Sequence, residues 1–302
     1  MDHRVAFDFE IDFTNGGSLQ GQDFRLDIPT DDVTDDWIAE AIVRDLRLLM
    51  VGDVRIRDRR VFEEAHKRGL VQEGGAAPAA GGGRRLIDLS HPIVEGMTTY
   101  PGLPVPEIHP FLTREASAER YAPGVTFAID VMTFCGNTGT YVDSPFHRYA
   151  DGADLAGLPL ERLIDVPAVR VDVTGAGIQA VDAPALLPYD LAGKAVLVHT
   201  EFDRHWGTEA YGRDNPFLTA AAVDLLVKEG AALVGIDSLN IDDPADLARP
   251  AHSGLLAAAI PICEHLTNLA SVPIEGAWFS AVPAPVSGTG TFPVRAIASI
   301  PQ

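Results

Sequence analysis

The sequence predicts a chain of two domains: a small ββαβ-like domain over residues 1–72 and a mixed α/β domain over residues 85–302. Three observations lead to this expectation. The chain opens with a period-two alternation of apolar and polar residues, which is typical of a strand with one buried face. Apolar, β-branched segments and helical patterns are interspersed beyond residue 85. Between these parts, residues 73–84 are rich in Gly, Ala and Pro, which cannot pack a core, and are predicted to be a linker.

The N-terminal domain is expected to be a small α+β unit without a catalytic group. Residues 14–18 contain an Asn-Gly-Gly run that tolerates positive φ, which favours a hairpin between the first two strands. N-cap candidates, among them Asp32 and Thr34, then precede apolar residues at helical spacing. The expected elements are strands over residues 5–13 and 19–28, a helix over residues 37–46 and a strand over residues 51–56.

The second domain is expected to combine seven strands with two clear helices. One helix is predicted over residues 215–229, with Pro216 near its start and Gly230 at its end. The other is predicted over residues 253–260, which would place His252 at its N-terminal edge. The predicted strands are residues 86–93, 127–134, 166–173, 195–199, 232–236, 277–282 and 294–300.

Composition excludes several classes of function. The chain carries 23 basic and 43 acidic residues, a net charge of −20 that repels nucleic acid and anionic membranes. Its apolar stretches are too short to span a bilayer, and the N-terminus lacks the apolar core of a secretory signal, so a cytoplasmic protein is expected. Cys135 and Cys263 are expected to be buried free thiols, with a nucleophilic role as the alternative.

Functional side chains are concentrated in residues 135–149, where small turn residues separate an amide, a phenol, a carboxylate and an imidazole. Asp143 and His147 lie four residues apart there, a spacing that suits a site or a structural ion pair. A second group contains further oxygen and imidazole ligands of the kind that bind zinc or manganese. Its members are Asp237, Asp242, Asp243, His252, Glu264 and His265. For His252 and Glu264 the alternative is a buried ion pair.

The residues of the first group carry a resemblance to a known family. Residues 137–147 read Asn-Thr-Gly-Thr-Tyr-Val-Asp-Ser-Pro-Phe-His. This segment resembles the motif His-x-Gly-Thr-His-x-Asp-x-Pro-x-His of the cyclase/kynurenine formamidase family of metal-assisted hydrolases. Further matches lie at residues 86–93, 96–97, 100–102, 235–237, 252, 264, 268–269 and 293–296. The resemblance covers residues 86–300 and implies a barrel-like mixed sheet of the swivelling β/β/α type and a homo-oligomer, commonly a dimer.

The resemblance implies a metal site made by Asp143, His147, His252 and Glu264. In that family the metal, zinc or manganese, polarises an amide or lactone carbonyl and activates water. Asn137 and Tyr141 stand where the family places its first two histidines, and both are poor replacements for imidazole. We therefore expect at most one divalent ion, with hydrolysis of an arylformamide or a related cyclic or linear amide as the implied reaction.

Two other functions remain open from the sequence. In a metal-independent cyclase or dehydratase of a biosynthetic intermediate, Tyr141 and Asn137 would donate hydrogen bonds to an oxyanion. His147 or His252 would then act as general base. The third possibility is a non-catalytic relative that keeps the ligand pocket.

Three aromatic residues are predicted to contact a small, aromatic substrate. They are Phe146, Trp206 and Trp278, for each of which packing is the alternative. His91 lies at the end of the first predicted strand of the domain, where a supporting role at the site and a structural role are both compatible with the sequence.

Overall fold

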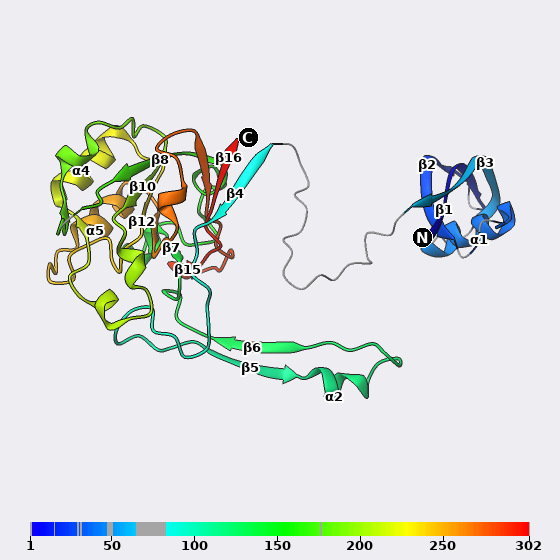
Figure 1. Cartoon of the computed structure of the whole chain (residues 1–302), viewed down its shortest axis with the longest axis horizontal. Coiled ribbons are helices and arrows are strands. Elements are labelled where there is room, and N and C mark those ends of the chain that lie inside the picture. Colours follow the sequence, from blue (N-terminus) through cyan, green and yellow to red (C-terminus); the bar gives the residue numbers. More distant parts are fainter. Residues whose placement is uncertain are drawn as a thin grey trace. The chain divides into compact units, whose positions relative to one another are not determined.

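The computed structural model of the protein describes residues 2–14, 16–28, 30, 32–46, 51–64, 83–175 and 177–301. These residues belong to two compact units, Met1–Ala79 and Ala80–Gln302 (Figure 1). Residues 73–82 of the predicted linker lie outside the described residues. None of the described helices is long and apolar enough to cross a bilayer.

The N-terminal unit is a three-stranded antiparallel sheet with one helix. Its elements are β1 (Asp2–Phe13), β2 (Ser18–Ile28), α1 (Asp35–Asp45) and β3 (Val51–Glu64), and the strand order is β2-β1-β3. The helix is capped by Thr34, whose side chain accepts a hydrogen bond from the N–H of Trp37. Strand β3 continues well beyond the predicted end at residue 56. The register of β3 against β1 shifts at Asp58, which has φ of 51°. This irregularity breaks the period-two pattern, so the pattern does not indicate that the strand continues.

The second unit is built on a curled, nine-stranded mixed sheet (Figure 1), which confirms the predicted fold class. The strand order is β15-β7-β13-β12-β10-β8-β14-β16-β4. The four central strands β8, β10, β12 and β13 run parallel to one another. The strands are β4 (Arg84–Asp88), β7 (Tyr141–Asp143), β8 (Val166–Asp172), β10 (Ala195–His199), β12 (Leu233–Ile236), β13 (Ile262–Glu264), β14 (Ala277–Ser280), β15 (Thr291–Pro293) and β16 (Ile297–Pro301).

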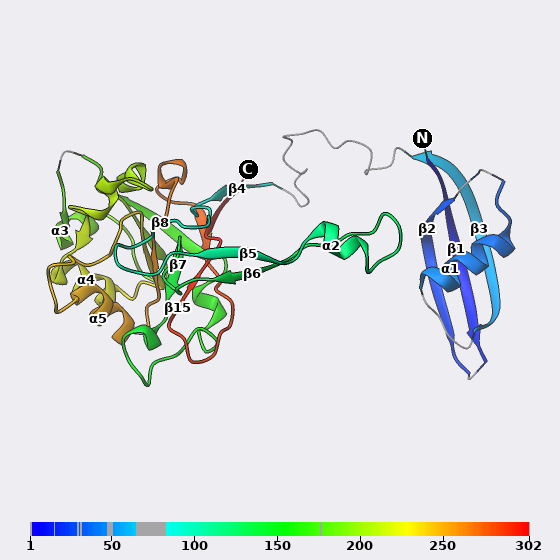
Figure 2. The ribbon, with the colours of Figure 1, turned by 90° about the horizontal axis from the view of Figure 1, so that it is seen from below.

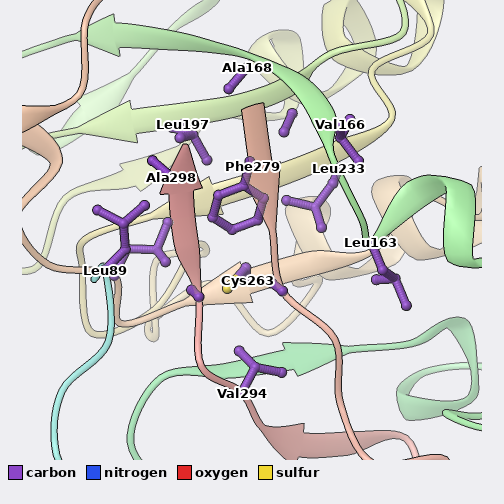
Figure 3. Close-up of a cluster of buried hydrophobic side chains, with 14 of the residues drawn as sticks. Leu89, Leu163, Val166, Ala168, Leu197, Leu233, Cys263, Phe279, Val294 and Ala298 are labelled. Atoms are coloured by element: carbon purple, nitrogen blue, oxygen red, sulfur yellow. The ribbon is translucent and has the colours of Figure 1, made fainter. Parts of the chain in front are cut away.

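Alternating side chains of the sheet fill two separate cores. On β10, Leu197 points into the core inside the curl, while Val196 and Val198 point toward the helices. Figure 3 shows the inner core, in which Phe279 lies beside Leu233 and Cys263. Cys263 is buried and free, as predicted, whereas Cys135 is free but only half-buried.

The outer core lies between the sheet and three helices, α3 (Ala183–Leu186), α4 (Ala220–Glu229) and α5 (Pro250–Ala257). Two predicted helix boundaries were wrong. Helix α4 begins after Thr219, because Phe217–Leu218 forms the short strand β11, which pairs with β9 (Ala180–Val181). Helix α5 begins at Pro250, whose fixed φ suits a first turn, so His252 lies inside the helix.

A two-stranded arm extends away from the sheet (Figures 1 and 2). It comprises residues 107–133, with β5 (Glu107–Leu112), α2 (Arg114–Ala118) and β6 (Ile129–Thr133). Every residue of β6 is exposed. The arm also exposes large apolar side chains, including Phe111 at 72% and Met132 at 62%. The chain segments on either side of the arm, residues 96–101 before it and 134–139 after it, lie next to each other, because the N–H of Gly139 donates a hydrogen bond to Thr99. The second of these segments leads into β7 of the sheet.

Candidate active site

Cross-strand pairing brings three functional side chains to one face of the sheet. Strands β7 and β13 are antiparallel, with Tyr141 opposite Glu264 and Asp143 opposite Ile262. The residues between them, Val142 and Cys263, point into the inner core. Tyr141, Asp143 and Glu264 therefore point to the opposite side, toward helix α5. All three are buried.

Helix α5 adds His252 to this face. Its Nε2 atom lies 3.7 Å from Oδ2 of Asp143 and 4.0 Å from Oε1 of Glu264. One donor atom from each of the three residues lies within 4.8 Å of the other two, so the group could hold a metal ion. These separations are too long for hydrogen bonds. Zinc bonds of about 2.0–2.2 Å would place tetrahedral donors roughly 3.3–3.6 Å apart, close to what is seen.

Asp143 gives the strongest indication of a cation. Its side chain is fully buried, and neither carboxylate oxygen has a hydrogen-bond partner among the described residues. An isolated buried carboxylate is very unfavourable unless a positive charge compensates it. The donor set of two carboxylates and one imidazole suits zinc or manganese. The residues present therefore fit one divalent ion.

Asp242 fixes the orientation of His252. Its buried carboxylate accepts hydrogen bonds from Nδ1 of His252 at 2.6 Å and from the backbone N–H groups of His252 and Ala251 at 3.1 and 2.6 Å. Burial opposes the negative charge, but these bonds outweigh it and lower the pKa of Asp242. The carboxylate thus caps the first turn of α5 and leaves Nε2 of His252 directed at the two other carboxylates.

Glu264 is held by two hydrogen bonds. The hydroxyl of Tyr141 donates to Oε2 at 2.5 Å, and the N–H of Ile241 donates to Oε1 at 2.6 Å. Burial, together with the charge of Asp143, raises the pKa of Glu264 to about 7 in the absence of a metal. Asn137 lies beside the Tyr141 hydroxyl and accepts a bond from Thr291 at 3.1 Å. Tyr141 therefore supports Glu264 directly, and Asn137 lies behind it.

His147 lies outside the three-residue group. It ends the short 3-10 helix Pro145–His147 and is exposed, with its ring centroid 5.7 Å from that of His252. A Cβ atom on Gly290 would lie 2.5 Å from the backbone of His147, so the strand-to-loop segment around Gly290 packs directly on it. The predicted four-ligand set thus reduces to three neighbouring ligands, with His147 at the edge of the group.

A cavity of about 510 Å³ is lined by residues that contact neighbours of the group in the chain, although no residue of the group lines it. Thr99 in its wall accepts a hydrogen bond from the N–H of Gly139, two residues before Tyr141. Tyr211, also in the wall, contacts His265, which follows Glu264 in the chain. The cavity is large enough for a small aromatic molecule. Its lining is Gly96, Met97, Thr98, Thr99, Pro101, Trp206, Gly207, Thr208, Glu209, Tyr211, Gly212 and Leu239.

An aromatic cluster forms one wall of this cavity. Trp206 stacks on His91 with ring centroids 3.9 Å apart, and its edge meets Tyr211 and His265. Tyr211 and Nδ1 of His265 share a 2.9 Å hydrogen bond. Burial lowers the pKa of His91 to about 4 and that of His265 to about 3, so both rings are neutral at physiological pH. His91 therefore supports Trp206.

The structure brings some of the predicted substrate contacts to the site and separates others. Trp206 lines the cavity. Phe146 is half-buried in the turn before His147 and does not line it. Trp278 lies on β14, four strands away from β13 in the sheet order, and its ring contacts the guanidinium of Arg84. The structure gives no support to a substrate contact by Trp278.

The curled mixed sheet, which is the fold class that the sequence predicts, carries a buried carboxylate–histidine group that could hold one metal ion. The family can be named from sequence: the cyclase family model matches residues 87–243, over half of the chain. The protein belongs to the cyclase family. The N-terminal unit lies outside the matched residues.

Individual relatives agree with this family. The chain is 28% identical over 212 residues to the kynurenine formamidase of Bacillus cytotoxicus, covering 70% of this chain and 95% of the relative. The kynurenine formamidase of Bordetella avium is 29% identical over 224 residues, covering 71% and 97%.

Solved structures extend the likeness to the fold. A potential metal-dependent hydrolase with cyclase activity has a TM-score of 0.60 at 25% identity and covers 72% of this chain and 99% of its own. An isatin hydrolase bound to the product analogue thioisatinate has a TM-score of 0.62 at 23% identity, covering 73% and 94%. The latter likeness concerns the fold alone.

Proposed function

We propose that this hydrolase cleaves the C–N bond of an amide, arylformamide-like or cyclic, or the ester bond of a lactone, with one divalent ion held by Asp143, His252 and Glu264. The observation that carries the proposal is the fully buried carboxylate of Asp143, whose two oxygens have no hydrogen-bond partner among the described residues and lie no closer than 3.7 Å to the ring nitrogen of His252. The names of the curated relatives support the substrate class, because a formamidase acts on an amide carbonyl.

Each residue has a role in this proposal. Asp242 holds His252 in the tautomer that presents Nε2 to the ion, and Tyr141 and Asn137 orient Glu264. His147, exposed beside His252, is placed to accept the proton of the attacking water and to return it to the leaving nitrogen. A zinc or manganese ion would supply Lewis-acid polarisation of the substrate carbonyl.

The metal-independent alternative has one observation in its favour. Burial disfavours a charged imidazole, but Asp143, Asp242 and Glu264 outweigh it and raise the pKa of His252 to about 10. An imidazolium could therefore compensate the carboxylates without a metal. Against this version, the Tyr141 hydroxyl donates to Glu264 and is not free to donate to an oxyanion.

The test measures metal binding and turnover separately. Chelator-treated protein is titrated calorimetrically with zinc and manganese, and formanilide and isatin hydrolysis are then followed spectrophotometrically. We expect one ion per chain and activity that depends on it. Asp143→Asn should abolish binding, whereas His147→Gln should bind the ion with little turnover. Full activity in strong chelator without bound metal would refute the proposal in favour of the metal-independent one.

We also propose that the protein is a homo-oligomer, at least a dimer, in which the arm packs on a second copy. An isolated two-stranded ribbon is marginally stable in water, and this one exposes apolar groups on both faces. Its strands β5 and β6 carry only Glu107 and Asp130 as acidic groups, so two chains of net charge −20 could meet there with little repulsion. Two-fold pairing would bury both arms.

Light scattering during size-exclusion chromatography tests the oligomer. Phe111→Glu and Met132→Glu place charges on the arm at positions that are 72% and 62% exposed, where a free arm would tolerate them. We expect both variants to be monomers and the unmodified protein to be a dimer or larger. Leu187→Glu, at a position 68% exposed outside the arm, is the matched control. A monomeric unmodified protein contradicts the proposal.

A further inference from the structure

We infer that the cavity lined by Trp206 and Tyr211 selects a substrate whose bound portion is uncharged or cationic, and that it discriminates against carboxylate-bearing substrates. The inference rests on the proposed amide hydrolysis, because it concerns the group that lies beside the scissile bond. The new element is a preference for the charge of the substrate, which follows from the residues that line and surround the cavity.

The lining of the cavity lacks a cationic partner for an anion. Among its lining residues, all of them described, none is Lys, Arg or His. Met97, Pro101, Trp206, Tyr211 and Leu239 supply an apolar surface, and the threonines supply neutral polar groups. Glu209 is the charged residue of this lining, and it is acidic. A carboxylate bound here would lose water without gaining an ion pair.

Arg213 does not offer a bound carboxylate a free ion-pair partner. It lines the neighbouring cavity together with His205 and Asp214, and its guanidinium lies 3.5 Å from the carboxylate of Glu209. It therefore compensates an acidic group that is already present. On the same loop, Arg204 is paired with Glu201 at 3.5 Å. Both of these arginines thus have a carboxylate beside them.

Buried acids behind the wall make the cavity still less favourable for an anion. Asp237 is fully buried and accepts bonds from the N–H and hydroxyl of Thr200 and the N–H of Glu201. Asp203 accepts bonds from Thr267 and Asn268. Burial, and then the charges of Asp237, Glu264 and Asp203, raise the pKa of Tyr211 well above its ordinary value. The wall at Tyr211 therefore lies in a negative potential.

A divalent ion at the site would not remove the negative potential at the cavity wall. The ion would neutralise Asp143 and Glu264, which are its own ligands in the proposal. Asp203 and Asp237 lie outside that group and would keep their effect on the cavity wall. A cationic substituent is favoured by the same potential, and an uncharged aromatic one is accepted by the apolar surface.

Three substrates, formanilide and two para-substituted derivatives, test the preference on the metal-loaded full chain. They are formanilide, anionic 4-formamidobenzoate and cationic 4-(aminomethyl)formanilide, with each rate divided by its alkaline hydrolysis rate to remove electronic effects. We expect kcat/KM for the anion to be at least tenfold below that of formanilide, and the value for the cation to equal or exceed it. Binding of the corresponding anilines, measured by calorimetry, should follow the same order.

Two variants complete the design. Thr208→Arg adds a cation to the cavity wall and should raise kcat/KM for 4-formamidobenzoate at least fivefold relative to formanilide. Leu187→Arg, at an exposed position that is not part of the cavity wall, should change nothing. Equal or better use and binding of the anions would overturn the inference while leaving amide hydrolysis standing. Absence of turnover of all three formanilides and of isatin would refute the hydrolysis, and the aniline binding order would still decide the charge preference.

Discussion

Asp242→Asn is the change that best separates support of the metal site from direct metal binding. The amide would turn its oxygen to His252 and keep those bonds, which leaves its NH₂ group facing the N–H of Ala251. One charge-assisted bond is lost and two others weaken, at a cost of about 2–4 kcal/mol in the unfolding free energy of metal-free protein. Loss of a supporting carboxylate lowers metal affinity about 10–100-fold.

The assays are denaturant unfolding of chelator-treated protein and calorimetric zinc titration of the native protein. A 10–100-fold rise in Kd corresponds to about 1.4–2.7 kcal/mol. Asp224→Asn is the control, because it removes the same charge from an exposed position of α4. If Asp242→Asn keeps normal stability and zinc affinity, or if Asp224→Asn loses as much, the supporting role assigned to Asp242 is wrong.

Four further outcomes are expected. Added zinc at about 100 times its Kd should stabilise the unmodified protein by about 2.7 kcal/mol, and this gain should vanish in Asp143→Asn, as thermal scans would show. The pKa of about 10 for His252 is raised above its unfolded value, so in chelator this residue's contribution to stability is complete below about pH 6.5 and is lost as pH rises toward 10. Because zinc must displace that proton, its affinity should increase with pH from 6 to 8, and calorimetry in buffers of different ionisation enthalpy should detect proton release. Gly290→Ala would place a Cβ atom against the backbone of His147 and should lower kcat at least tenfold while zinc binding is retained. Gly157→Ala is the control and should be neutral, because a Cβ atom there finds ordinary contact distances. An unchanged kcat in Gly290→Ala would argue against His147 as the base.

The sequence predicted the class of the fold. The motif match of residues 137–147 indicated that Tyr141 and Asp143 belong to one group of polar side chains, but it did not indicate the strand β7, on which Tyr141 lies opposite Glu264 and Asp143 opposite Ile262. Helix α5 was predicted several residues late, because apolar periodicity continues past its last turn while Pro250 marks its start. That shift moved His252 from the edge of a helix into its first turn.

Other features depend on tertiary contacts that spacing does not encode. The position of Asp143 and His147 four residues apart is compatible with a shared ion, but the structure groups Asp143 with His252 and Glu264, and His147 lies at the end of a 3-10 helix beside His252. The sequence indicates Asp242 only as one member of an acidic group. Its contact with His252 depends on the course of the loop between them, which has no periodic pattern. Strand β5 was missed because Glu107, His109 and Pro110 interrupt any strand-like pattern.

The pairing of β4 with β16 constrains the order in which the two units can fold during synthesis. Asp88 pairs with Ile297, more than two hundred residues later, and β16 separates β4 from β14 in the nine-stranded sheet. During synthesis β4 therefore has no neighbour until the last strand of this chain emerges from the ribosome. The N-terminal unit pairs only within residues 2–64 and can fold while the remainder is still being translated. The hydrolase unit cannot complete its sheet until β16 is available, and pairing of such distant strands is slow.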